Sequence, residues 1–265
     1  MRSSHKVRGG ARTQLLFCIL PLFVLGTSQR CFGDESNPLG LADASFYAID
    51  YPAAVTAYDA LLRNRPEDPQ ILWRMARVHV CLAEVQEDAQ RKSMCEAAED
   101  YARRCIRADS TLAEGHTWLA AALGYIALSE GAHRQAEISG EILAETDRAL
   151  QLNPRDDAAL SIRGSVFRAL GNVGWVKRQL ASLLYGGVPA GGFEEAEEAL
   201  GQAIGLAPDV MRHSYELGVL YLDWDREVDA RRVLEQALTM PIRVAIDRPR
   251  REKIKLLLSR LAGEA

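Results

Sequence analysis

The residues most suggestive of chemistry are two pairs of glycines that lie directly before an expected helix. Gly186–Gly187 and Gly191–Gly192 flank Pro189, and glycines before a helix can place free backbone N–H groups around a phosphate. The first turns of the helix that follows carry four glutamates, which would repel a phosphate: Glu194, Glu195, Glu197 and Glu198. No Gly-Lys-Ser/Thr motif is present and no strand is expected before the loop. We therefore interpret the loop as a joint between two helices.

The remaining polar residues lack the spacing of a catalytic or metal site. Four histidines beyond the first 33 residues show no H-E-x-x-H or comparable pattern: His79, His116, His133 and His213. His116 is interpreted as a packing residue, with metal binding as the alternative. No serine has a nucleophile-elbow context, and Asp156–Asp157 is interpreted as the cap of a helix. The sequence predicts a protein without enzymatic activity, cofactor or metal.

The N-terminal segment has the pattern of a secretory signal peptide. Four basic residues among the first twelve precede the apolar run "LLFCILPLFVLG" at 15–26, and no acidic residue comes before Asp34. The run is shorter than the roughly 20 residues that span a bilayer. We predict a signal peptide over 1–33, a linker over 34–44 and a helical domain over 45–265, in an exported, periplasmic or secreted protein. The alternative is a retained membrane anchor or a cytoplasmic protein.

Composition and charge restrict the class of partner. A hydrophobic content of 48% over 265 residues is enough for a substantial core, which excludes a disordered chain. Residues 1–33 hold five basic and no acidic residues, so the net charge of −4 for the whole chain becomes −9 for residues 34–265. Phosphate backbones are bound by clustered Lys and Arg. We therefore expect no nucleic-acid partner.

Three cysteines follow the N-terminal segment, and they lack metal-binding spacing: Cys81, Cys95 and Cys105. We interpret them as buried thiols of helices. A Cys95–Cys105 or Cys81–Cys95 disulfide is the alternative for an oxidising compartment.

From residue 50 onward the apolar residues follow a helical period, and a longer repeat lies above it. Segments with small or apolar residues at offsets 0, 4 and 7, most of them followed by a proline-type stop, begin at Ala54, Ala98, Ile142, Ala196 and Ala230. The helix after each of the first four stops has a small residue that allows a close helix contact, at Ala76, Ala120, Gly164 and Gly218. The pattern resembles the tetratricopeptide repeat (TPR). It predicts an all-α protein, a right-handed α-solenoid of TPR-like helix pairs.

Two additions to this pattern are expected. The stops at Pro66, Ser110, Pro154 and Pro208 are 44, 44 and 54 residues apart, longer than the family's period of about 34 residues. The longest interval predicts an extra inserted helix over 173–185. A C-terminal capping helix is expected from about Pro249 to Leu261, because apolar residues share one of its faces.

Several longer segments are similar to the regulator of microtubule dynamics family. They are "HTWLAAALGYIALSEG" from His116, "DRALQLNPRDDAALSIRG" from Asp147, and Trp175 within "VGWVKRQLASLLYGGVP". The resemblance covers residues 45–263. It implies a non-enzymatic helical repeat protein; some members are attached to mitochondria or endoplasmic reticulum through an N-terminal segment, and one relative binds phospholipid. Microtubule binding is not carried over, because an exported chain would not meet tubulin and an acidic surface suits the acidic tails of tubulin poorly.

The first helix of each pair in such a solenoid lines the concave face, the usual ligand surface. Counting offsets places nine residues there: Trp73, Arg77, Thr117, Ala121, Tyr125, Ser165, Arg168, Arg212 and Tyr215. This aromatic, small and basic lining predicts a groove that binds a protein segment, an extended peptide with an acidic group. The alternative is a phospholipid or other hydrophobic ligand, with its phosphate on Arg77 or Arg168; a membrane is a partner only if the N-terminal segment is retained. A third interpretation is that the aromatic residues only pack and the arginines are solvated.

Overall fold

The computed structural model describes residues 37–174 and 189–263, all of which belong to one unit, residues 33–265. The predicted signal peptide and residues 175–185 of the predicted extra helix lie outside the described residues. The described part of the chain is helical and contains no strand. Its elements are α1 (Pro38–Tyr47), α2 (Tyr51–Asn64), α3 (Pro69–Ala83), α4 (Asp88–Ala108), α5 (Ala113–Ala127), α6 (Ala132–Leu152), α7 (Asp157–Gly171), α9 (Phe193–Leu206), α10 (Met211–Asp223), α11 (Glu227–Leu238) and α12 (Asp247–Leu261).

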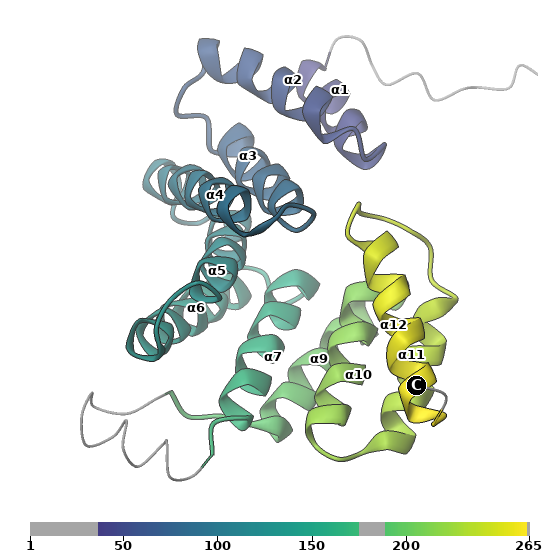
Figure 1. Ribbon diagram of the computed structural model, residues 1–265. Coiled ribbons are helices and arrows are strands. Elements are labelled where there is room, and N and C mark those ends of the chain that lie inside the picture. Colours follow the sequence, from purple (N-terminus) through teal and green to yellow (C-terminus); the bar gives the residue numbers. More distant parts are fainter. Residues whose placement is uncertain (1–36, 175–188, 264–265) are drawn as a thin grey trace, which may run out of the picture. The chain divides into compact units, whose positions relative to one another are not determined.

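Consecutive helices pack side by side in pairs (Figure 1): α1 with α2, α3 with α4, α5 with α6, α7 with α9, and α10 with α11. The first helices of neighbouring pairs, α3, α5, α7 and α10, contact one another in turn. The predicted all-α fold of stacked TPR-like helix pairs is confirmed.

The proline-type stops lie in turns of one kind. In each turn the N–H of the last residue donates to the carbonyl three positions earlier, and the next helix follows. The four turns run from Arg65 to Asp68, Asp109 to Leu112, Asn153 to Asp156, and Ala207 to Val210, with N···O distances of 3.1–3.4 Å. The repeat found in the sequence is therefore a repeat of local structure.

Glycine at two repeat positions allows the helices of a pair to touch. A Cβ on Gly164 would lie 2.6 Å from Cγ of Leu200, and a Cβ on Gly218 would lie 2.6 Å from Cγ of Leu234. Both distances are well inside van der Waals contact. Ala230 on α11 is likewise fully buried. The structure confirms that the predicted small residues lie at contacts between helices.

Helix α1 occupies most of the stretch that the sequence analysis assigned to a linker, 34–44. Pro38 is in its first turn and the Asn37 side chain accepts a hydrogen bond from the N–H of Gly40 at 3.1 Å, so the helix has a regular start. Phe46 is buried and stacks on Tyr51 of α2 with ring centroids 5.4 Å apart. The domain therefore begins earlier than residue 45.

The C-terminal helix α12 packs against α10 and α11, as the capping prediction requires. Ile254 is fully buried beside Leu234 and Met240. The carboxylate of Asp247 accepts hydrogen bonds from the N–H groups of Arg243 and Val244 at 3.0 and 3.1 Å, which orders the loop before the helix.

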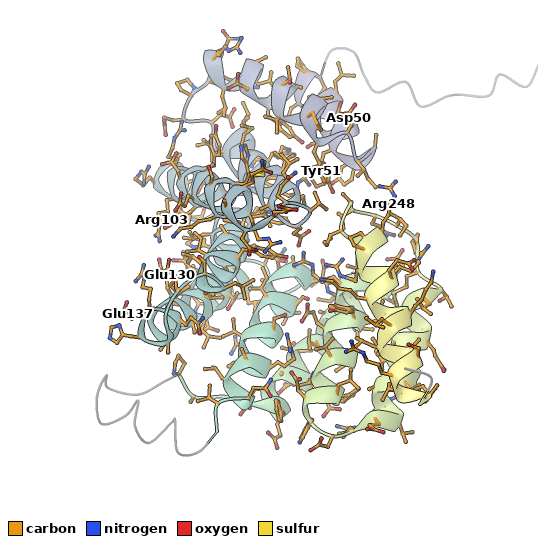
Figure 2. The ribbon with its side chains drawn as sticks, viewed as in Figure 1. Asp50, Tyr51, Arg103, Glu130, Glu137 and Arg248 are labelled. Atoms are coloured by element: carbon orange, nitrogen blue, oxygen red, sulfur yellow. The ribbon has the colours of Figure 1, made fainter. Side chains whose placement is uncertain are left out.

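Ion pairs tie the outer helices of adjacent pairs together. Arg103 of α4 binds Glu141 of α6 at 2.6 Å, and Lys92 of α4 approaches Glu130, in the turn before α6, within 3.5 Å. Figure 2 labels Arg103 and Glu130 on this side of the molecule.

The three cysteines of the described residues are free thiols. Cys81, Cys95 and Cys105 are buried and unpaired, so the disulfide alternatives are wrong for this structure. Burial raises the pKa of Cys95 to about 11 and that of Cys105 to about 12, which keeps both as neutral thiols.

The glycine loop is described only from residue 189. Gly191 has φ 129°, a conformation that favours glycine. The carboxylate of Glu195 accepts a hydrogen bond from the N–H of Gly192 at 2.8 Å. The glutamate thus occupies the position that a bound anion would need. This agrees with the interpretation of the loop as a joint between two helices. Gly186–Gly187 lie outside the described residues.

Candidate functional site

A cavity of about 340 Å³ opens between α5, α6, α7 and α10. Five of the nine predicted groove residues line it: Ala121, Tyr125, Ser165, Arg168 and Arg212. These five residues come from α5, α7 and α10, and the first and last of them are 91 positions apart in the chain.

The walls of the cavity are made of small and aliphatic side chains. Ala121 and Gly124 lie on one face of α5, and Ile162, Val166 and Ala169 lie on one face of α7, at the spacing of successive helical turns. The small residues of α5 leave space where larger ones would have filled it. Leu128 lies at the rim and is 71% exposed. The wall is suited to an aliphatic group.

One end of the cavity is polar and is held by a buried carboxylate. Glu84, the C-cap residue directly after α3, has a side chain only 1% exposed. It accepts a hydrogen bond from the hydroxyl of Tyr125 at 2.6 Å and forms an ion pair with Arg212. Burial, with the nearby Arg250, lowers the pKa of Arg212 to about 10, and burial raises the pKa of Tyr125. At neutral pH the arginine is charged and the phenol is neutral.

Arg168 is also paired within the chain. Its guanidinium donates to Asp223 at 2.8 Å and approaches Glu216 within 3.5 Å. Glu216 lines the cavity and its side chain is 19% exposed. Both arginines, Arg168 and Arg212, line the cavity, as expected, but each already has a carboxylate partner that offsets its charge.

Arg77 and Trp73 are placed away from the cavity, under α1. Arg77 is 7% exposed and pairs with Asp43 of α1 at 3.2 Å. Its guanidinium carbon lies 3.7 Å from the centre of the Phe46 ring and 4.9 Å from that of Trp73. Assigning α1 to a linker left this face of α3 uncovered, which is why the sequence placed both residues in an open groove.

Thr117 and Tyr215 have structural contacts instead of cavity contacts. The hydroxyl of Thr117 is buried and donates to Asp156 at 2.7 Å, and Asp156 caps α7 by accepting from the N–H of Ala159 at 2.9 Å. Tyr215 packs in the cluster around Met211.

Two histidines contact carboxylates of other helices, His116 within the α5–α6 pair and His213 between the α7–α9 and α10–α11 pairs. His116 lies 2.6 Å from Glu145 through Nδ1, and His213 lies 2.8 Å from Asp157 through Nε2. Asp157 thus binds a histidine, whereas Asp156 caps the helix. Among the described residues no group of three His, Cys, Asp or Glu side chains is arranged to hold a metal ion. His116 has the packing role that its repeat position indicated.

Glu84 and Glu216 were not among the residues predicted from the sequence. Glu216 lies four residues after Arg212, one helical turn along the same face of α10, so the counting that found Arg212 could have found it. Glu84 is at the end of α3, and its burial depends on α10, which no local pattern indicates.

Within residues 37–174 and 189–263, no helix has the length and apolar character that crossing a membrane requires.

The family model "Regulator of microtubule dynamics protein 1-3" matches residues 43–262. Regulator of microtubule dynamics protein 3 of Xenopus laevis is 26% identical over 212 residues, which are 78% of this chain and 46% of that protein. Regulator of microtubule dynamics protein 1 of Caenorhabditis elegans is 26% identical over 184 residues, which are 68% of this chain and 81% of that protein. The chain thus spans about half the length of the Xenopus laevis relative.

Two solved structures share the fold. A thermophilic TPR protein of Thermus thermophilus has a TM-score of 0.62 and 23% identity, covering 84% of this chain and 100% of that chain. PilW, a type IV pilus biogenesis factor, has a TM-score of 0.54 and 16% identity, with 86% of each chain covered.

These relatives correct the predicted location. The two family relatives come from animals, which have no periplasm, and are named for microtubules, which lie inside cells. The prediction of an exported, periplasmic or secreted protein is therefore wrong.

The family model spans most of the chain, and the stacked helix pairs agree with it. This chain belongs to the regulator of microtubule dynamics family and has a TPR-like fold.

Proposed function

We propose that the chain is a non-enzymatic binding protein, a scaffold that holds a segment of a partner protein in the cavity between α5, α6, α7 and α10. The observation that carries this proposal is that five residues chosen by repeat position alone line one cavity. The concave surface of a helical solenoid is where this architecture presents ligand contacts.

The size and lining of the cavity support a side-chain pocket. A volume of about 340 Å³ lies at the lower end of the range for ligand sites, roughly 300–1,000 Å³. It accepts one or two side chains of a partner segment, while the segment's backbone stays outside at the rim near Leu128. Aliphatic walls supply the affinity, and the polar groups at one end fix the orientation.

The phospholipid alternative loses its two phosphate partners. Arg77 is covered by α1 and paired with Asp43, and Arg168 is paired with Asp223 and Glu216. A phosphate at either arginine would have to displace a carboxylate. We therefore favour a protein segment.

Gly124→Leu tests the proposal because it fills the cavity without disturbing the helix. A Cβ on Gly124 meets no atom within 4 Å, and the residue lines the cavity. Gly201→Leu is the matched control, because Gly201 is an exposed glycine of α9 with equally open space.

Peptides of twelve residues are selected from a random phage-displayed library with the full chain, and their affinities are measured by fluorescence anisotropy. We expect Gly124→Leu to weaken binding about ten-fold or more, equivalent to about 1.4 kcal/mol or more, and Gly201→Leu to leave it unchanged. Equal affinities of both variants for every selected peptide would refute the cavity as the site.

A further inference from the structure

We propose that the cavity selects an apolar and basic segment: an aliphatic side chain enters it, and a neighbouring Lys or Arg of the partner binds Glu216. This inference rests on the proposed function and specifies the chemistry of the partner.

The charges around the cavity favour a cation over an anion. Two guanidinium groups, Arg168 and Arg212, are matched by three carboxylates, those of Glu84, Glu216 and Asp223. The nearby Arg250–Asp247 pair is buried and neutral as a unit. The cluster therefore carries one excess negative charge, although arginines line the cavity.

Glu216 is the carboxylate that can accept a further donor. Glu84 is enclosed and already binds Tyr125 and Arg212. Asp223 accepts from Arg168 at 2.8 Å and from the side-chain amide of Asn172 at 2.7 Å. Glu216, in contrast, approaches Arg168 only at 3.5 Å, the outer limit of a hydrogen bond. Glu216 lines the cavity, and its carboxylate retains acceptor capacity.

Apolar and polar contacts are close enough for one short segment to use both. Glu216 lines the same cavity as Ile162, Val166 and Ala169. An aliphatic side chain against this wall places the adjacent residues of its segment near the polar end. The methylene groups of a Lys or Arg can cover further apolar surface while the charged group reaches Glu216.

The net charge of the whole domain also favours a basic partner segment. Residues 34–265 carry a net charge of −9, and a field of one sign accelerates encounters with partners of the other sign. An acidic segment is disfavoured both at a distance and at the cavity.

Three synthetic twelve-residue peptides test this specificity. All have the same central Leu-Leu pair, which is flanked by Lys in the first, Gln in the second and Glu in the third. Binding to the full chain is measured by fluorescence anisotropy at two salt concentrations. We expect the Lys peptide to bind tightest and the Glu peptide weakest, with a difference between Lys and Gln peptides that shrinks as salt increases.

Glu216→Gln identifies the carboxylate responsible. We expect it to weaken the Lys peptide about five-fold and to leave the Gln peptide unchanged, as for one partly exposed ion pair. Glu235→Gln, at an exposed position of α11, is the control and changes neither affinity. Thermal unfolding by circular dichroism establishes that both variants are folded.

The results separate the inference from the proposed function. Gly124→Leu should abolish the preference for the Lys peptide together with its binding. If Gly124→Leu weakens all three peptides but the Gln or Glu peptide binds best, the cavity binds protein and the inferred charge preference is wrong. If Gly124→Leu instead leaves the binding of every peptide unchanged and weakens binding to vesicles that contain phosphatidylserine, both the partner class and the inference are overturned.

Discussion

The phenol oxygen of Tyr51, the first residue of α2, accepts a hydrogen bond from the backbone N–H of Ala245 at 3.1 Å, across 194 positions of the chain. Tyr51 is buried, and Ala245 lies in the loop before α12. Figure 2 shows Tyr51 on the side of α2 toward Arg248, in the first turn of α12. The first helix pair is thus bonded to the last part of the domain.

Tyr51→Phe removes this bond and keeps the ring. We expect the free energy of unfolding to fall by about 1 kcal/mol, because the amide of Ala245 loses its partner. Urea denaturation followed by circular dichroism measures the change. Tyr47→Phe is the control, since the Tyr47 hydroxyl has only a 3.4 Å contact with Arg77; an equal loss in both variants would contradict a special role for Tyr51.

Gly218→Ala introduces a methyl group at a helix contact. Its Cβ would lie 2.6 Å from Cγ of Leu234, a branching atom that cannot move away without shifting the leucine. We expect a loss of about 1–3 kcal/mol in thermal or urea unfolding. Gly201→Ala, where space is open, should instead gain about 0.5–1 kcal/mol from helix propensity. A stabilised Gly218→Ala protein would disprove the close contact.

Asp43→Ala leaves Arg77 buried without its carboxylate. Asp43 binds Arg74 at 2.9 Å and Arg77 at 3.2 Å, and accepts a hydrogen bond from the Tyr58 hydroxyl at 2.6 Å. Removing one partner of such a buried pair costs about 3 kcal/mol.

The exposed Asp59–Arg63 pair of α2 provides the comparison. Asp59→Ala should cost less than about 1 kcal/mol. Similar losses from the two substitutions in urea denaturation would show that Asp43 does not hold α1 against α3.

The lowered pKa of buried His79 predicts a loss of stability in mild acid. Burial lowers its pKa, although its Nδ1, 2.8 Å from the carbonyl oxygen of Met75, raises the pKa in part. The unfolded chain, whose histidine has a pKa of about 6.5, therefore takes up a proton that the folded chain resists. Stability falls as the pH drops below this value toward the lower pKa of the folded state.

His79→Gln should reduce this dependence when the free energy of unfolding is measured between about pH 7.5 and 5. His133→Gln, at an exposed position of α6, should retain it. If the free energy of unfolding of His79→Gln depends on pH as strongly as that of the unchanged protein, His79 is not the source of the dependence.

The repeat was predictable from the sequence because each part of it is local. Small residues at Gly164 and Gly218, the stops at Pro66 and Pro154, and a leucine-rich last helix all act on neighbours in the chain. Helix α1 was missed because its ten residues show no clear apolar face and include a glycine, so its order depends on Phe46 and Asp43 meeting other helices.

The cavity was predictable only in part for the same reason. Counting along α5, α7 and α10 found Tyr125, Arg168 and Arg212, because one face of each helix points inward. Helical spacing does not predict that Glu84 pairs with Arg212 or that α1 covers Arg77. Those contacts join residues 128 and 34 positions apart and depend on the curvature of the stack.

The ion pair between Glu84 and Arg212 affects how the domain unfolds. A repeat array whose members touch only their neighbours can fray from an end, one unit after another. Here Glu84, directly after α3 of the second helix pair, forms an ion pair with Arg212 of the fifth, so unfolding of either of these pairs breaks a bond to the other. Heat should then disrupt the stack in a single step, as it does a small globular domain.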